Sequence, residues 1–263
     1  MHDISESRAA EMLNKVPPIT LAFWVIKVMS TTVGETGADY LAVHVGLGTA
    51  ITDGVMLTLL IAALLLQLRY RQYVPWIYWL TVVLVSIVGT QITDALTDGL
   101  DVSLYVSTAV FATMLAATFV IWYSYERTLS IHTIVTRRRE LFYWAAILFT
   151  FALGTAAGDL ATEARSLGFG VGVFVFGLLI ALIGAAYALG ANAVLTFWLA
   201  YILTRPLGAS FGDLLSQART YRGLGLGTVR TSIVFLFIIT TLVVFLSATE
   251  TNVRVRSNVD KKI

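Results

Sequence analysis

Four aspartates recur at one fixed place in a pattern that the chain repeats four times. In each copy a tryptophan is followed ten residues later by a glycine and after five more by an aspartate, W-x9-G-x4-D. The copies are Trp24–Gly34–Asp39, Trp79–Gly89–Asp94, Trp144–Gly154–Asp159 and Trp198–Gly208–Asp213. Fixed internal periods are the signature of repeat architectures. Each aspartate lies in an apolar run, where an ionisable group is costly and usually functional.

Other oxygen-bearing side chains accompany these acids. Glu35 lies four residues before Asp39, so the two share a helix face, and the equivalent position holds Thr90 and Thr155 in the next two copies. A further polar position, six residues after the tryptophan, holds Ser30, Thr150 and Thr204. Carboxylate and hydroxyl oxygens suit Mg²⁺, Mn²⁺, Ca²⁺, Na⁺ or a proton and argue against copper. The sequence therefore predicts a metal-ion and proton site with these hydroxyls in support; its acids are Glu35, Asp39, Asp94, Asp159 and Asp213.

Two basic residues occupy the same apolar runs. Lys27 lies eight residues before Glu35, and Arg205 lies eight before Asp213, about two helical turns in each case. One interpretation makes them internal counter-charges that compete with a transported cation; the other has Lys27 snorkelling to the membrane interface. Pro206 predicts either an unwound stretch over 204–208 or a simple kink.

The elements that carry these residues are predicted to be transmembrane helices. The chain is 57% hydrophobic with a mean hydropathy of +0.81, and only 13% of it is charged, against about a quarter in a soluble domain. A helix needs about 20 apolar residues to cross a bilayer, which gives an all-α membrane protein with about eight spans. They are expected at Thr20–Tyr40, Ala50–Leu68, Pro75–Leu96, Leu104–Tyr125, Leu141–Leu160, Val171–Leu189, Leu195–Leu214 and Thr231–Leu246.

The motif places the spans in four parallel two-helix repeats. Asp39 and Asp159 are 120 residues apart and Asp94 and Asp213 are 119 apart, so the chain divides into two pseudo-symmetric halves. We expect a cytoplasmic segment at 1–15, halves at 16–130 and 131–250, and a basic cytoplasmic tail at 251–263. Of the 18 lysines and arginines, twelve fall on the side of the N-terminus and four on the other. This bias predicts that both termini are cytoplasmic.

Three segments resemble a known family: KVPPITLAFWVIKVMSTTVGETGAD at 15–39, FYWAAILFTFALGTAAGDL at 142–160 and FWLAYILTRPLGASFGDLL at 197–215. They are similar to a bacterial inner-membrane family labelled as an uncharacterised "membrane-anchored protein". The resemblance runs from Lys15 to about Gly227, and the second repeat departs from it most, with GTQITDAL at 89–96. It implies a multi-pass protein of the bacterial inner membrane and no particular chemistry.

The function predicted from the residues is secondary transport or export of a cation, most plausibly a divalent metal such as Mn²⁺, coupled to protons. The alternatives are a cation channel with acidic rings, a membrane-embedded enzyme on paired carboxylates, and a structural role. There is no Walker motif, no cysteine, and a net charge of only +2. We therefore expect no enzyme activity, no cofactor and no nucleic-acid partner; membrane lipids and the cation are the expected partners, and the sequence leaves a homo-oligomer open.

Overall fold

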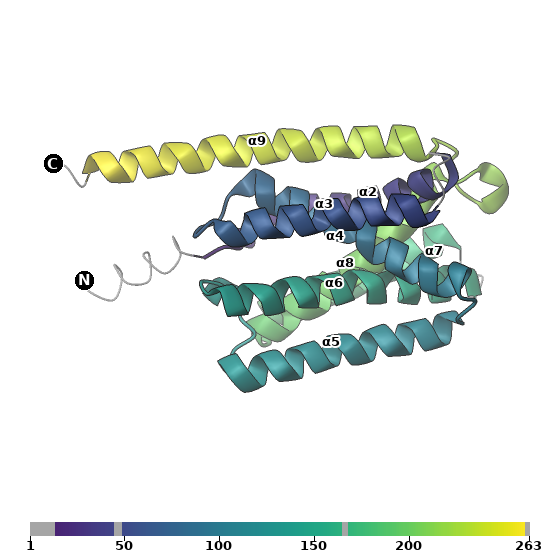
Figure 1. Cartoon of the computed structure of the whole chain (residues 1–263), viewed down its shortest axis with the longest axis horizontal. Coiled ribbons are helices and arrows are strands. Elements are labelled where there is room, and N and C mark those ends of the chain that lie inside the picture. Colours follow the sequence, from purple (N-terminus) through teal and green to yellow (C-terminus); the bar gives the residue numbers. More distant parts are fainter. Residues whose placement is uncertain (1–13, 45–48, 165–167, 261–263) are drawn as a thin grey trace.

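The computed structural model describes residues 14–44, 49–164 and 168–260, which form eight α-helices and no strand (Figure 1). The helices are α2 Leu21–His44, α3 Thr49–Arg69, α4 Pro75–Asp94, α5 Leu104–Glu126, α6 Arg137–Asp159, α7 Phe169–Ala188, α8 Ala193–Ser216 and α9 Thr228–Asp260. Two five-residue π-helices, η1 Ala95–Gly99 and η3 Leu160–Ala164, directly follow α4 and α6. Two short 3₁₀-helices lie in loops, η2 Ile131–Thr133 and η4 Arg219–Tyr221.

Local sequence signals set several helix starts. Pro75 opens α4, where its fixed φ suits the first turn and its missing N–H is not needed. Side-chain oxygens of Ser103, Thr136 and Asn192 accept hydrogen bonds from the first-turn N–H groups of α5, α6 and α8. These caps satisfy donors that would otherwise have no partner at the helix ends.

Seven of the described helices are long and apolar enough to cross a membrane, as in a multi-pass membrane protein. The exception is α2, whose Lys27, Glu35 and several threonines lower its hydropathy. The span expected at Thr20–Tyr40 is thus a helix of the right length but of more polar composition. It is tolerated because most of its described side chains are buried among other helices.

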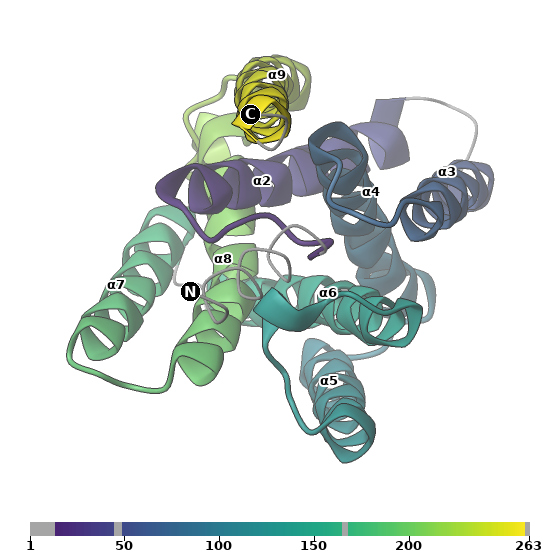
Figure 2. The same ribbon diagram turned by 90° about the vertical axis from the view of Figure 1, so that its left-hand side faces the viewer.

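The four motif-bearing helices α2, α4, α6 and α8 form an inner ring, and α3, α5, α7 and α9 surround it (Figure 2). In the most apolar stretch of α4, α6 and α8, 61–78% of the residues are buried, against 6–22% for the outer helices. The outer helices therefore present apolar side chains to the surroundings on nearly every face, as expected in lipid.

The motif glycines are the points where the inner helices touch. A Cβ built on Gly34 would collide with Ser86, one on Gly154 with Arg205, and one on Gly208 with Thr31. A Cβ on Gly89 would lie 2.7 Å from the Cβ of Phe151. Each glycine thus meets the residue seven positions after the tryptophan in the neighbouring copy, and the contacts close a ring in the order α2, α4, α6, α8. Absence of a side chain lets the backbones approach.

Hydrogen bonds between inner helices follow the same register. The Thr31 and Thr32 hydroxyls donate to the carbonyls of Thr204 (3.3 Å) and Gly208 (3.0 Å) on α8. Thr93 on α4 donates to the Ala152 carbonyl on α6 at 3.1 Å. Along α2 and α8 the bonded residues follow one another in the same order, so the two helices are parallel.

Each outer helix packs mainly against the inner helix of the following repeat and much less against that of its own. Thus α3 lies on α4, α5 on α6 and α7 on α8, while α9 returns to α2. The repeats therefore interlock around the ring, because the two helices of one repeat contact each other little and each outer helix packs on the next repeat.

The α8 helix continues through Pro206 without an unwound stretch. Of the two alternatives at 204–208, the unwound one is therefore wrong. Pro206 packs beside Gly154 and Gly158 of α6, where a built Cβ would lie 3.1 Å and 3.4 Å from the ring atoms of the proline. The neighbouring helix has glycines where the proline ring needs space.

Candidate functional site: an arginine at the centre of the ring

Every fourth residue of the inner helices, counted from the residue before the motif tryptophan, is buried inside the ring along four successive levels. We call this the axial stripe: the positions −1, +3, +7, +11 and +15 relative to the motif tryptophan, which advance about 6 Å per step along a helix. Position −1 holds Phe23, Tyr78, Tyr143 and Phe197; position +3 holds Lys27, Val82, Ile147 and Tyr201; position +7 holds Thr31, Ser86, Phe151 and Arg205; and position +11 holds Glu35, Thr90, Thr155 and Ala209. All sixteen are buried. Side chains therefore fill the axis at these four levels.

Arg205 occupies the centre of this stripe and is completely buried. Its Nη2 forms an ion pair with Glu35 Oε2 at 2.7 Å. Its Nη1 donates to the carbonyl of Thr31 at 2.8 Å. The planar fork of a guanidinium is suited to several oxygens in fixed directions, and here both come from α2.

Two threonine hydroxyls complete the shell around the guanidinium. Thr155 Oγ1 accepts from Arg205 Nε at 3.1 Å and from Nη2 at 2.8 Å, and Thr90 Oγ1 accepts from Nη2 in a short contact. The arginine of the fourth repeat is thus bound by oxygens from the other three. We call these groups (the Glu35 carboxylate, the Thr90 and Thr155 hydroxyls and the Thr31 carbonyl) the oxygen shell.

The predicted acids are only partly brought together. Glu35 lies in the oxygen shell with Thr90 and Thr155, as their common motif position suggested. Asp94 and Asp159 are the last residues of α4 and α6 and are half-buried; Asp213 is buried near the end of α8. These three stand at position +15, one turn beyond Glu35. Asp39 lies within α2, but its side chain is outside the described residues.

In the part of the chain that the structure describes, no group of three or more His, Asp or Glu side chains could hold a metal ion. A multi-carboxylate metal site made by the described acids alone is therefore not present in this conformation. The oxygens that do converge are bound to Arg205.

The second predicted polar position does not reach the guanidinium. Ser30, Thr150 and Thr204 are buried, but none of the hydrogen bonds of Arg205 goes to them. Thr204 Oγ1 donates instead to the Tyr201 carbonyl at 2.6 Å. These residues precede the axial position +7 by one residue and so point about 100° away from it.

Lys27 lies inside the ring and does not snorkel. Only 1% of it is exposed, and its Nζ has no hydrogen-bond partner among the described residues. The nitrogen lies 3.9 Å from the ring centroid of Phe151 and 4.3 Å from that of Tyr201. Aromatic faces attract a cation but provide no hydrogen bond, so the ammonium of Lys27 is buried without an oxygen partner among the described residues.

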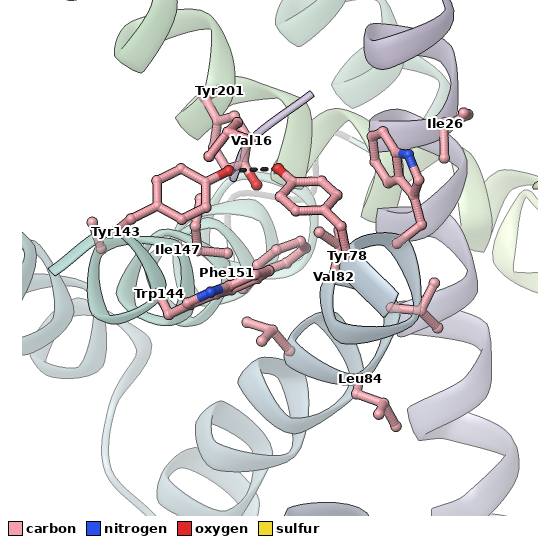
Figure 3. Packing of buried hydrophobic residues seen from close by; sticks show 14 of the residues in the cluster. Val16, Ile26, Tyr78, Val82, Leu84, Tyr143, Trp144, Ile147, Phe151 and Tyr201 are labelled. Carbon is pink, nitrogen blue, oxygen red and sulfur yellow. Dashed lines mark hydrogen bonds between the residues drawn. The ribbon is translucent and has the colours of Figure 1, made fainter. Parts of the chain in front are cut away.

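The axis is closed at the N-terminal end of the inner helices by aromatic residues. The hydroxyls of Tyr78 and Tyr143 lie 2.5 Å apart, and Val16 and Tyr201 lie beside them (Figure 3). Trp79, Trp144 and Trp198 are buried at this level.

The segment at 14–16 holds this closure in place. Lys15 Nζ pairs with Glu140 Oε2 at 2.5 Å, and both side chains are buried. Gln67 donates to the other Glu140 oxygen at 3.2 Å. Backbone bonds join Lys15 to Ile134 and Tyr73 to Asn14. The chain before α2 is thus attached to two loops across the end of the ring.

Four stretches of the chain match one family model, that of the Repeat of Unknown Function (DUF347), at residues 22–73, 77–128, 142–190 and 196–252. The chain belongs to this family. Each DUF347 repeat spans one inner helix and the outer helix after it, which confirms the fourfold internal repeat read from the motif. Comparison with curated proteins and with solved structures finds no match.

Sequence reasoning missed the partner of Arg205. It related the arginine to Asp213 on the same helix, whereas the ion pair joins it to Glu35 of the first DUF347 repeat. The available signal was the spacing of four: read as one face, positions +7 and +11 put Arg205 and Glu35 on the same axis.

Proposed function

We propose that this protein is a secondary transporter that exchanges a cation for protons across a membrane. The observation that carries the proposal is the ion pair between Arg205 and Glu35, fully enclosed in an oxygen shell that three repeats supply to the fourth. A single carboxylate cannot pair with Arg205, a substrate cation and a proton at once. Such mutual exclusion is the condition for exchange.

The proposed cycle begins with Glu35 paired to Arg205, the arrangement described above. Protonation of Glu35, or binding of a cation to the oxygen shell, weakens the ion pair that holds Arg205 there. Because the shell and the arginine inside it together involve all four repeats, its rearrangement changes contacts between the halves, which rock relative to one another in many repeat-built carriers.

The aspartates at position +15 are proposed as the approach to the shell. Acidic side chains recurring at one level attract cations and raise their local concentration. A divalent ion such as Mn²⁺ favours several oxygen ligands, carboxylates among them, so Asp39, Asp94, Asp159 and Asp213 are the residues expected to contact it.

The orientation and location are part of the same proposal. The excess of basic residues on the side of the N-terminus supports cytoplasmic termini, and the family resemblance supports the bacterial inner membrane. Lipids would contact the exposed apolar faces of α3, α5, α7 and α9, and the cycle requires no cofactor.

The filled axis favours a carrier over the two alternative functions. A channel needs a continuous path, whereas four successive levels of the stripe are buried side chains. An enzyme would need its acids beside a substrate cleft, whereas Glu35 contacts Arg205 inside the bundle. Ion currents far above carrier turnover in planar bilayers would favour the channel.

The test is cation-driven proton movement in proteoliposomes with a pH-sensitive dye inside. Chlorides of Mn²⁺, Mg²⁺, Ca²⁺, Na⁺ and guanidinium are added outside in turn at equal ionic strength. We expect at least one cation to move protons through the wild-type protein, and Glu35→Gln to reduce this to the level of protein-free vesicles.

The matched control is Glu140→Gln, which also alters a buried ion pair but at the closed end of the ring. It should retain coupled transport per folded protein. The proposal is wrong if no cation in the panel moves protons through the wild type, or if Glu35→Gln transports as well as the control.

A further inference from the structure

The oxygen shell has the charge of a site for a singly charged cation. It contains one carboxylate, two hydroxyls and one carbonyl, all from side chains or backbone within the ring. Ca²⁺ and Mg²⁺ sites in proteins take six or more oxygens, usually with more than one carboxylate or several waters. Here a single negative charge is balanced by a single guanidinium.

The geometry of the shell is that of a guanidinium receptor. Three nitrogens of one plane are used: Nε and Nη2 donate to Thr155, Nη1 to the Thr31 carbonyl, and Nη2 also to Glu35 and Thr90. The oxygens thus accept from N–H groups along several edges of one flat cation, which is the recognition that the fork of a guanidinium offers. The ring of Phe151 lies 5.8 Å from Arg205 Cζ, within the range in which aromatic faces attract such cations.

Arg205 lies at a point where α8 lacks one backbone hydrogen bond. The next residue, Pro206, lacks the N–H that would bond back into α8, and helices bend at such points. On that side α6 has only glycines, and its backbone packs directly against α8: a Cβ on Gly154 would collide with Arg205 and lie 3.1 Å from Pro206. A bend of α8 at this point would carry the guanidinium out of the shell.

We propose that the oxygen shell is the substrate site for small guanidinium-type organic cations, and that Arg205 occupies it as an attached substitute until substrate or a proton displaces it. The inference rests on the proposed exchange function and names its substrate class. It assigns substrate contact to Glu35, Thr90, Thr155 and the Thr31 carbonyl.

Two measurements test it. The first is thermal unfolding of purified Arg205→Ala in detergent with millimolar guanidinium chloride, NaCl or MnCl₂ at equal ionic strength, concentrations far below those that denature. We expect guanidinium alone to raise the unfolding temperature, and the double variant Arg205→Ala/Glu35→Gln to lose that response. The second is proton movement driven by guanidinium in wild-type proteoliposomes, which needs no variant that must fold.

The outcomes separate the inference from the proposed function. Guanidinium-driven proton movement in the wild type together with the selective response of Arg205→Ala supports both; if that variant does not fold, the transport result decides alone. If Mn²⁺ or Na⁺ moves protons and guanidinium does not, the inference is overturned and exchange stands. If Arg205→Ala responds to guanidinium but the wild type does not transport it, Arg205 is a fixed structural bridge and the inference is likewise overturned. If no cation moves protons, both fall.

Discussion

At the scale of single residues, Arg205 and Glu35 form a buried ion pair. In such surroundings a charge that loses its partner is strongly destabilising. Removing one member of a buried pair costs about 3–5 kcal/mol, because the other charge stays buried alone. Removing both in favour of neutral groups of similar size is often close to neutral. A single substitution in this pair should therefore lower stability, whereas a double substitution that removes both charges should change it little.

We predict that Arg205→Met destabilises the protein by about 3–5 kcal/mol and that Arg205→Met/Glu35→Gln recovers most of the loss. Denaturant unfolding in a mild detergent, followed by tryptophan fluorescence, measures both. Equal stability of Arg205→Met and the wild type would show that the pair does not form.

Lys27 gives the contrary prediction, since its ammonium is buried with aromatic rings and no oxygen within hydrogen-bond distance in the described structure. Burial of an unsatisfied polar group costs about 1–3 kcal/mol, so Lys27→Met should stabilise the protein by a comparable amount. The matched control is Lys15→Met, which removes the partner of buried Glu140 and should destabilise. The same unfolding assay compares them, and a destabilised Lys27→Met would mean that Lys27 has a polar partner.

Much of this residue-scale arrangement was predictable. The recurring position that holds Glu35, Thr90 and Thr155 does converge, because equivalent places in parallel repeats meet at a common axis. The spacing of four indicates that Arg205 lies on the same axis, but its contacts with the other three repeats were not predictable, since helical spacing alone does not say which helices are neighbours. Which repeat faces which depends on the order of packing around the ring.

At the scale of elements, the glycines of the motif decide how closely the inner helices approach. The cost of a side chain at such a point is overpacking, typically about 1–3 kcal/mol and more where the backbone must move. The same glycines are also the reason that the ring closes in one register.

Gly34→Ala is predicted to lower stability by at least about 1–3 kcal/mol, because its Cβ would meet Ser86. Gly184→Ala on α7 is the control: nothing lies within 4 Å of its added Cβ, and alanine favours a helix by about 1 kcal/mol. Ser86→Gly should rescue Gly34→Ala in part. Thermal unfolding of the four proteins tests the contact, and equal effects of the two alanines would contradict it.

Helix existence and type followed from hydropathy and length, and most expected spans agree with the helices to within a few residues. The π-helices after Asp94 and Asp159 had no signal in composition, because they differ from an α-helix only in which carbonyl each N–H meets. The packing of outer helices was also beyond the sequence. A helix that is apolar all round looks the same whether it faces lipid or protein.

At the scale of the whole molecule, the outer layer of helices is completed by the last helix, α9, which lies on the first inner helix, α2. The hydroxyls of Thr36 on α2 and Ser232 on α9 are 2.7 Å apart, although 196 residues separate them. The chain contains no cysteine, so introduced pairs have no competitors.

We predict that Thr36→Cys/Ser232→Cys forms a disulfide on mild oxidation in native membranes, because side chains this close satisfy the short reach of the bond. Thr36→Cys with Thr241→Cys, an exposed site two to three turns farther along α9, is the control and should not. Protease cleavage between the second and third repeats followed by non-reducing electrophoresis reads the link. Separation of the fragments of the first pair would contradict the closure.

The interlocked outer helices have a consequence for how such a chain could arise. The α5 helix of the first half packs against α6 of the second half, and α9 of the second half packs against α2 of the first. A shorter ancestor with only two repeats would have had no place of its own for its final helix, and a second molecule of the same kind would have supplied it. Two such molecules exchanging their last helices form a closed twofold assembly, and joining their genes end to end would require no surface that the pair did not already possess.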